Sequence, residues 1–106
     1  MKKLFIISIL FSLAGNSFAL ANPEGKVLID KSDCLTCHKI DAKLIGPSYQ
    51  EVAIKYKDQK EAVDVLAEKI IKGGSGVWGR VPMLAHSTLS QEDAKKIVEW
   101  ILTQTQ

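Results

Sequence analysis

The 106-residue sequence has only two cysteines, three prolines and 7% aromatic residues, and it has no strong excess of either charge. Two cysteines allow at most one disulfide, which excludes a small domain stabilised by several bridges. A formal net charge of +2 does not provide the basic surface that nucleic-acid binding calls for. The sequence also lacks internal repeats, low-complexity segments and long alternating runs bounded by hairpin turns, so the strand signal is weak.

The longest apolar run lies at the N-terminus. A short basic start precedes the run 4–14, and small residues ending in an A-x-A pattern follow it. This order predicts a secretory signal peptide over residues 1–21, cleaved after Ala21 or, as the alternative, after Ala19. Eleven apolar residues at ~1.5 Å each are shorter than the ~30 Å core of a bilayer, which disfavours a retained anchor. We therefore expect a periplasmic protein without a membrane anchor.

Cleavage after Ala21 would leave one small domain, residues 22–106. Two of the 14 basic residues lie in the leader, so the mature chain has 12 basic and 12 acidic residues. A domain of this size buries a thin core and commonly needs a disulfide, a metal or a cofactor to complete it. A bridge between Cys34 and Cys37 would close a very short loop and would stabilise little. We expect a monomer whose core is completed by a bound group.

Caps and apolar spacing predict an all-α domain of about four helices. Asn22 before Pro23 is typical of a helix start, and this first helix is predicted to run to about Asp33. A second, short helix is predicted over 48–56, after a Gly-Pro pair.

The third helix is predicted to follow Asp58 as its cap and to end at Gly73, and Ser90 is predicted to cap the last helix. Two loops, 39–47 and 73–89, lie between these helices, and loops are where binding residues concentrate. The last helix is predicted to bury one apolar stripe, made of Ala94, Ile97, Val98 and Ile101.

Both cysteines lie in the stretch "CLTCH", Cys34 to His38, which has three interpretations. A redox pair of the thioredoxin type needs neighbouring strands, which the sequence does not predict. A zinc site could use both cysteines with His38 and the distant His86, but structural zinc sites usually pair histidines three to five residues apart. The third interpretation is covalent haem attachment, whose signature is C-x-x-C-H. It explains why His38 follows Cys37 directly, and we favour it.

The second axial position on a haem iron decides whether the site is open to small ligands or closed for electron transfer. Met83 is the only methionine outside the leader, and it lies in the glycine-rich loop far from the cysteines. His86, three residues further on, is the rival candidate. We favour Met83, with His86 as an exposed loop residue, although a lone methionine can equally be core filler.

The segments "CLTCHKIDAKLIGPSYQEVAIKY" and "GVWGRVPM", followed by a final amphipathic helix with Trp100, resemble the short bacterial class I cytochromes c. The resemblance covers about residues 27–103. It implies a small cytochrome c fold wrapped around one haem c, attached through Cys34 and Cys37. It also implies that His38 and Met83 ligate the iron.

The same resemblance gives roles to two further residues and shows one departure. Pro47 matches the proline whose carbonyl accepts a hydrogen bond from the ligand histidine, and such a bond fixes the histidine tautomer. Trp78 matches a tryptophan near the haem propionates, although simple core packing is the alternative. Many short members have proline on both sides of the methionine, whereas Leu84 follows Met83 here and Arg80 replaces an apolar residue or proline. The loss of one fixed φ angle should make this loop less rigid.

The function implied by the resemblance is a periplasmic monohaem electron carrier and not an enzyme. Its partners would be redox proteins, an electron donor and an acceptor, with no nucleic acid and no membrane anchor. A peroxidase-like enzyme would instead need an open iron site. A haem-free binding module would not need His38 or Met83 as iron ligands.

Overall fold

The computed structural model describes residues 22–105, so the predicted signal peptide lies outside the described residues. The described chain is helical, with no named strand, and this confirms the predicted all-α class. No helix in this part of the chain is long and apolar enough to cross a membrane. Its elements in chain order are α1 (Pro23–Lys31), the short 3₁₀ helix η1 (Cys34–Thr36), α2 (Tyr49–Tyr56), α3 (Ala62–Lys72) and α4 (Gln91–Ile101).

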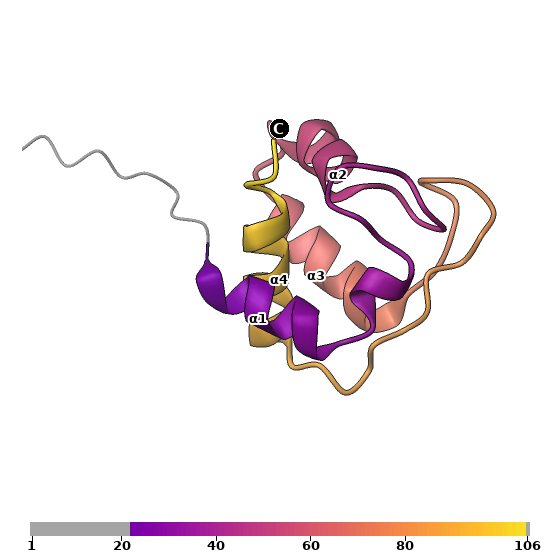
Figure 1. Ribbon diagram of the computed structural model, residues 1–106. Helices are drawn as coiled ribbons and strands as arrows, with labels where there is room; N and C mark the ends of the chain where they lie inside the picture. Colours follow the sequence, from indigo (N-terminus) through magenta and orange to yellow (C-terminus); the bar gives the residue numbers. More distant parts are fainter. Residues whose placement is uncertain (1–21, 106) are drawn as a thin grey trace, which may run out of the picture.

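The first and last helices, α1 and α4, cross and pack against each other (Figure 1). Gly25 makes this close crossing possible, because a Cβ atom there would lie 2.2 Å from the Lys96 carbonyl oxygen and 2.7 Å from the Trp100 Cβ. Nothing in the sequence pattern singled out this glycine. An ion pair between Lys96 and Glu24, with 2.7 Å between Nζ and Oε2, adds a surface contact at the same crossing.

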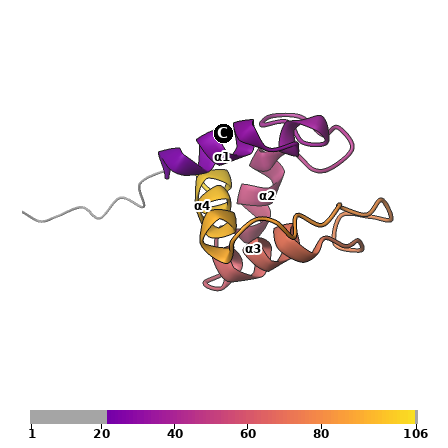
Figure 2. The ribbon, with the colours of Figure 1, turned by 90° about the horizontal axis from the view of Figure 1, so that it is seen from below.

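The core lies where α3 packs beside α4 under α1 (Figures 1 and 2). The largest fully buried side chains are Ile29, Ile97 and Val98. The predicted stripe of the last helix is confirmed, since all four of its members are buried. Ser90 caps α4 as predicted, because its side chain accepts a hydrogen bond from the Asp93 amide at 3.1 Å.

The helix boundaries follow the caps with two exceptions. Asn22 caps α1 as predicted, but α1 ends at Lys31, two residues early, where the Ser32 backbone turns extended. The prediction that Asp58 caps the third helix is wrong: the chain turns through 57–61, and Glu61 precedes α3 without a side-chain cap. Gly73 ends α3 as predicted, at a positive φ of 69° that favours glycine.

Helix α2 begins with a complete capping box. The Ser48 side chain accepts a hydrogen bond from the Glu51 amide, and the Glu51 carboxylate accepts one from the Ser48 amide, both at 3.0 Å. This arrangement fixes the chain immediately after Pro47. The loops 39–47 and 73–89 leave the helices on the same side of the molecule (Figure 2).

Candidate haem site

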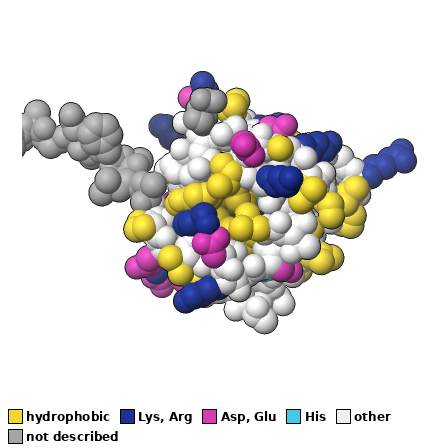
Figure 3. Space-filling view, viewed as in Figure 1, with side chains coloured by type: hydrophobic (Ala, Val, Ile, Leu, Met, Phe, Trp, Pro, Cys, Tyr) yellow, Lys and Arg dark blue, Asp and Glu magenta, His cyan; other side chains and the backbone are white. Residues whose placement is uncertain are grey.

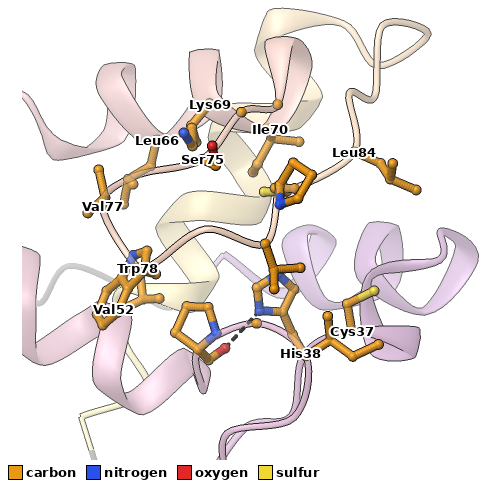
Figure 4. Close-up of a pocket in the computed structure, with 18 of the residues that line it drawn as sticks. Cys37, His38, Val52, Leu66, Lys69, Ile70, Ser75, Val77, Trp78 and Leu84 are labelled. Atoms are coloured by element: carbon orange, nitrogen blue, oxygen red, sulfur yellow. Dashed lines mark hydrogen bonds between the residues drawn. The ribbon is translucent and has the colours of Figure 1, made fainter.

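A cavity of about 720 Å³ opens between these two loops, with helix side chains behind it. Figure 4 shows Cys37 and His38 on one side of it and Leu66, Ile70 and Val77 on the other. In Figure 3, hydrophobic side chains gather in the middle of one face, with charged side chains around them. The cavity brings together all six residues that the sequence assigned to the site, namely Cys34, Cys37, His38, Pro47, Trp78 and Met83.

The two cysteines line the cavity and are not bonded to each other. Cys34 begins η1, and the Cys37 and His38 amides both donate hydrogen bonds to the Cys34 carbonyl, at 3.2 and 3.0 Å. This tight turn, which the sequence analysis missed, sets both thiols beside one cavity. Burial raises the pKa of the Cys34 thiol, and the neighbouring Asp33 charge raises it further. A thiol kept protonated is a poor redox nucleophile, which disfavours the thioredoxin-like interpretation.

The His38 ring is oriented by the Pro47 carbonyl, whose oxygen lies 2.7 Å from Nδ1 (Figure 4). A carbonyl can only accept, so Nδ1 carries the hydrogen and donates it. Nε2 is therefore the ring nitrogen left available to bind a metal ion.

Two neighbours hold the same ring in place. Tyr49 stacks on His38 with 5.4 Å between ring centroids, and Tyr49 in turn meets Trp100 edge to face at 6.0 Å. A Cβ atom on Gly46 would lie only 2.6 Å from the His38 Cε1. The sequence analysis did not identify Gly46 as a site residue, because a close approach between loop and ring leaves no pattern in the sequence.

Met83 lines the cavity from the opposite loop, and its backbone is paired with Gly74. The Gly74 amide donates to the Met83 carbonyl at 3.0 Å, and the Met83 amide donates to the Gly74 carbonyl at 2.8 Å. Since Gly74 lies two residues after the end of α3, this pair ties the methionine to the end of that helix. The residue after it, Leu84, is exposed.

Trp78 lies earlier in the same loop, at the cavity edge (Figure 4). Its side chain is partly exposed, and the Lys55 ammonium lies 5.6 Å from its ring centroid. Trp100, by contrast, packs against the core.

His86 does not have the exposed position that the sequence analysis expected. Only 18% of its side chain is accessible, and its Nε2 lies 2.6 Å from the Asp33 Oδ1. Its other ring nitrogen, Nδ1, is buried without a hydrogen-bond partner. The hydrogen bond from His86 lowers the pKa of Asp33.

The residues around the cavity fit a haem better than they fit a zinc ion. Among residues 22–105, no group of three or more cysteine, histidine or acidic side chains is arranged to hold a metal ion. This disfavours the Cys₂His₂ interpretation, in which His86 would have joined the cysteines. A largely apolar cavity lined by two thiols and an imidazole suits a porphyrin attached through sulfur.

The fold and this donor set define a small helical protein built around one covalent haem. Comparison with known proteins supports this class: the sequence model described as Cytochrome c matches residues 23–105. A cytochrome c-552 from Hydrogenobacter thermophilus is 45% identical over 103 residues, which are 97% of this chain and 98% of that protein. A cytochrome c-551 from Azotobacter vinelandii is 47% identical over 79 residues, 74% of this chain and 95% of that protein.

Solved structures agree. The crystal structure of wild-type cytochrome c552 from Nitrosomonas europaea matches with a TM-score of 0.71 and 42% identity, and it covers 74% of this chain and 98% of that one. The chain therefore belongs to the cytochrome c family, as a class I monohaem cytochrome c. Family membership implies one covalently bound haem c, and Cys34 and Cys37 have the spacing for it. It makes this chain an electron-transfer protein and not an enzyme.

Proposed function

We propose that this chain is exported to the periplasm, that its mature domain comprises residues 22–106, and that it carries single electrons through a haem ligated by His38 and Met83. The haem supplies the one-electron chemistry when it is bound. The protein supplies the thioether links at Cys34 and Cys37, the two ligands and a cavity that keeps water away.

The hydrogen bond between His38 and Pro47 is the observation that carries this proposal. It leaves Nε2 as the nitrogen that can bind a metal, in the same cavity that Met83 and both thiols line. A donor bond of this kind also makes the imidazole more basic, which strengthens its bond to iron. Stacking by Tyr49 and the absence of a side chain at Gly46 keep the ring from turning.

Met83 is the natural second ligand because its backbone is already fixed. Two hydrogen bonds to Gly74 hold it at the cavity, so little chain freedom remains to be lost when its sulfur binds. His86, the rival, is engaged with Asp33 instead. Methionine sulfur raises the reduction potential relative to a second histidine, which suits a carrier. We assign Trp78 as a donor to the haem propionates from the cavity edge.

The partners we propose are a redox donor and a redox acceptor that bind briefly at the cavity mouth. Encounters of this kind bury under ~1,200 Å². Two basic side chains there, Lys43 and Arg80, are exposed and could steer an acidic partner.

Replacing Met83 by alanine tests the ligand assignment. We expect a lower reduction potential, loss of the weak charge-transfer band of iron–methionine bonding, and rapid binding of cyanide to the ferric protein. Ile54→Ala is the control, since this apolar side chain is 59% exposed and does not line the cavity. An unchanged band and potential in Met83→Ala would rule out this ligand.

Mass spectrometry of the exported protein tests the signal cleavage and the covalent attachment of haem. We expect the mass of residues 22–106 plus one haem, and no haem in a variant with alanine at both Cys34 and Cys37. A protein that keeps residues 1–21 would disprove the cleavage, and a bare polypeptide mass would disprove the attachment.

A further inference from the structure

A side-chain hydrogen bond joins the two walls of the cavity. His86 belongs to the loop that carries Met83, and Asp33 directly precedes Cys34 in the other wall. The two residues are 53 positions apart in the sequence, and their Nε2 and Oδ1 atoms are 2.6 Å apart. Both side chains line the cavity.

The pair is not an ordinary ion pair between two solvated side chains. Asp33 is largely exposed, but the His86 ring is mostly buried, and its Nδ1 has no partner. A buried polar atom without a hydrogen bond is unfavourable, so another contact must hold the ring in this position. Asp33 also makes no side-chain capping bond to η1, although it is the residue before that helix. Within the described chain, neither side chain therefore makes a hydrogen bond to any partner other than the other member of the pair.

The remaining hydrogen bonds of this loop lead back to its own side of the cavity. Met83 pairs with Gly74, and the His86 amide donates to the Ile70 carbonyl at 3.0 Å. Within residues 22–105, the bond from His86 to Asp33 is the only hydrogen bond that joins the loop 73–89 to the chain before α3. The loop also lacks a proline after Met83, so its backbone is less restricted there.

We propose that His86 and Asp33 form a clasp that holds the loop carrying Met83 against the segment carrying the haem cysteines, and so keeps Met83 at its ligand position. His86 is then a positioning residue, not a ligand. The role rests on the proposed function, because it presumes that Met83 is the iron ligand. The clasp compensates for the flexibility that Leu84 introduces in place of proline.

Cyanide binding to the ferric holoprotein measures this role, because cyanide can enter only while the methionine is displaced. We expect His86→Ala and Asp33→Ala each to raise the binding rate about fivefold, the effect of losing the net contribution of one ordinary hydrogen bond. The double variant should be no faster than either single variant, since both changes remove the same contact. Asp64→Ala is the matched control: it removes an exposed carboxylate whose Oδ1 lies 3.0 Å from the Lys95 Nζ, away from the loop.

Amide hydrogen exchange gives a second measurement that does not depend on cyanide. The Met83 amide donates to Gly74, so its exchange rate reports opening of the loop. We expect faster exchange at Met83 in both single variants and no change in Asp64→Ala. If His86→Ala folds poorly, the exposed Asp33→Ala still tests the clasp.

The outcomes separate the two proposals. Fast cyanide binding in Met83→Ala, with wild-type rates and exchange in His86→Ala and Asp33→Ala, would overturn the clasp alone. A wild-type rate in Met83→Ala would overturn the ligand assignment, and with it the reason for a clasp. Independent, additive effects of the two clasp substitutions would show that the residues act separately and would also overturn it.

Discussion

The two sides of this molecule are built in different ways. On the helical side, α1, α3 and α4 bury Ile29, Ile97 and Val98 to 1% exposure or less. On the loop side, large apolar side chains remain exposed around the cavity, with Val77 at 55% and Val81 at 65%. The helical side is packed by its own residues, whereas the loop side presents apolar surface to a group that is not polypeptide.

This difference separates the residues that fold the chain from those that adjust the haem. Helix contacts should determine whether the protein is stable, and they should have little effect on its spectrum. Loop contacts such as those of Gly46 and His86 lie beside the proposed ligands, so they should change the spectrum and potential at a smaller cost in stability. The predictions below test this division, in order of decreasing effect.

Removing the haem should have the largest effect. With alanine at both Cys34 and Cys37, we expect loss of most of the helical circular dichroism, because a domain of this size cannot replace the part of its core that the haem supplies. The comparison is with the wild-type holoprotein purified from the same export-competent cells. Native helix content without haem would show that the helical side folds alone, and the division would then be sharper than we propose.

Truncating the helical core should come next. Ile97→Ala should cost about 2–5 kcal/mol of unfolding free energy, since the buried side chain leaves a cavity. Leu84→Ala, a change of similar size on the loop side, should cost less, because the polypeptide packs against little of that side chain. Denaturant unfolding of the two holoproteins measures both. Equal costs would contradict the division.

Two glycine substitutions should separate stability from spectrum. Gly25→Ala should cost about 1–3 kcal/mol with an unchanged spectrum, because overpacking at the α1–α4 crossing outweighs the ~1 kcal/mol that alanine gains in a helix.

Gly46→Ala should instead push the His38 ring aside and change the reduction potential and the iron–methionine band, at a smaller cost in stability. Thermal unfolding and potentiometry on both variants provide the comparison. A shifted reduction potential in Gly25→Ala, or an unchanged one in Gly46→Ala, would contradict the division between the helical side and the loop side.

The smallest effect should come from the surface ion pair at the same crossing. The Lys96 ammonium lowers the pKa of Glu24 below its ordinary value of 4.5, so the pair stabilises the protein above that value. Its contribution is lost as the pH falls through the lowered pKa. Glu24→Gln should therefore be slightly less stable than wild type at neutral pH and equal to it at strongly acid pH, by thermal unfolding at low salt. A difference that persists in acid would point to packing instead.

Sequence patterns predicted the helix ends, which depend on the chemistry of a few neighbouring residues. The helix caps at Asn22 and Ser90 and the glycine stop at Gly73 are readable because a short stretch of chain determines them. The prediction that Asp58 caps the third helix was wrong because the residue types that favour helix caps also favour turns. The chain continues to turn as far as Glu61 before α3 begins.

Contacts between distant segments could not be predicted in this way. Gly25 and Gly46 are important because other parts of the chain come close to them, and a single sequence does not show which parts do. The bond between His86 and Asp33 spans 53 residues and depends on how two loops meet. The candidate ligands themselves were readable, because the C-x-x-C-H spacing and the lone Met83 in its loop are local features.

The capping box of α2 has a consequence beyond that helix. Ser48 and Glu51 fix the chain immediately after Pro47, and the Pro47 carbonyl holds the proton of the His38 imidazole. Warming that frays the first turn of α2 would therefore weaken the hydrogen bond that holds this proton before the protein unfolds. The temperature coefficient of the electrode midpoint should register the melting of one helical turn that contributes no ligand to the metal.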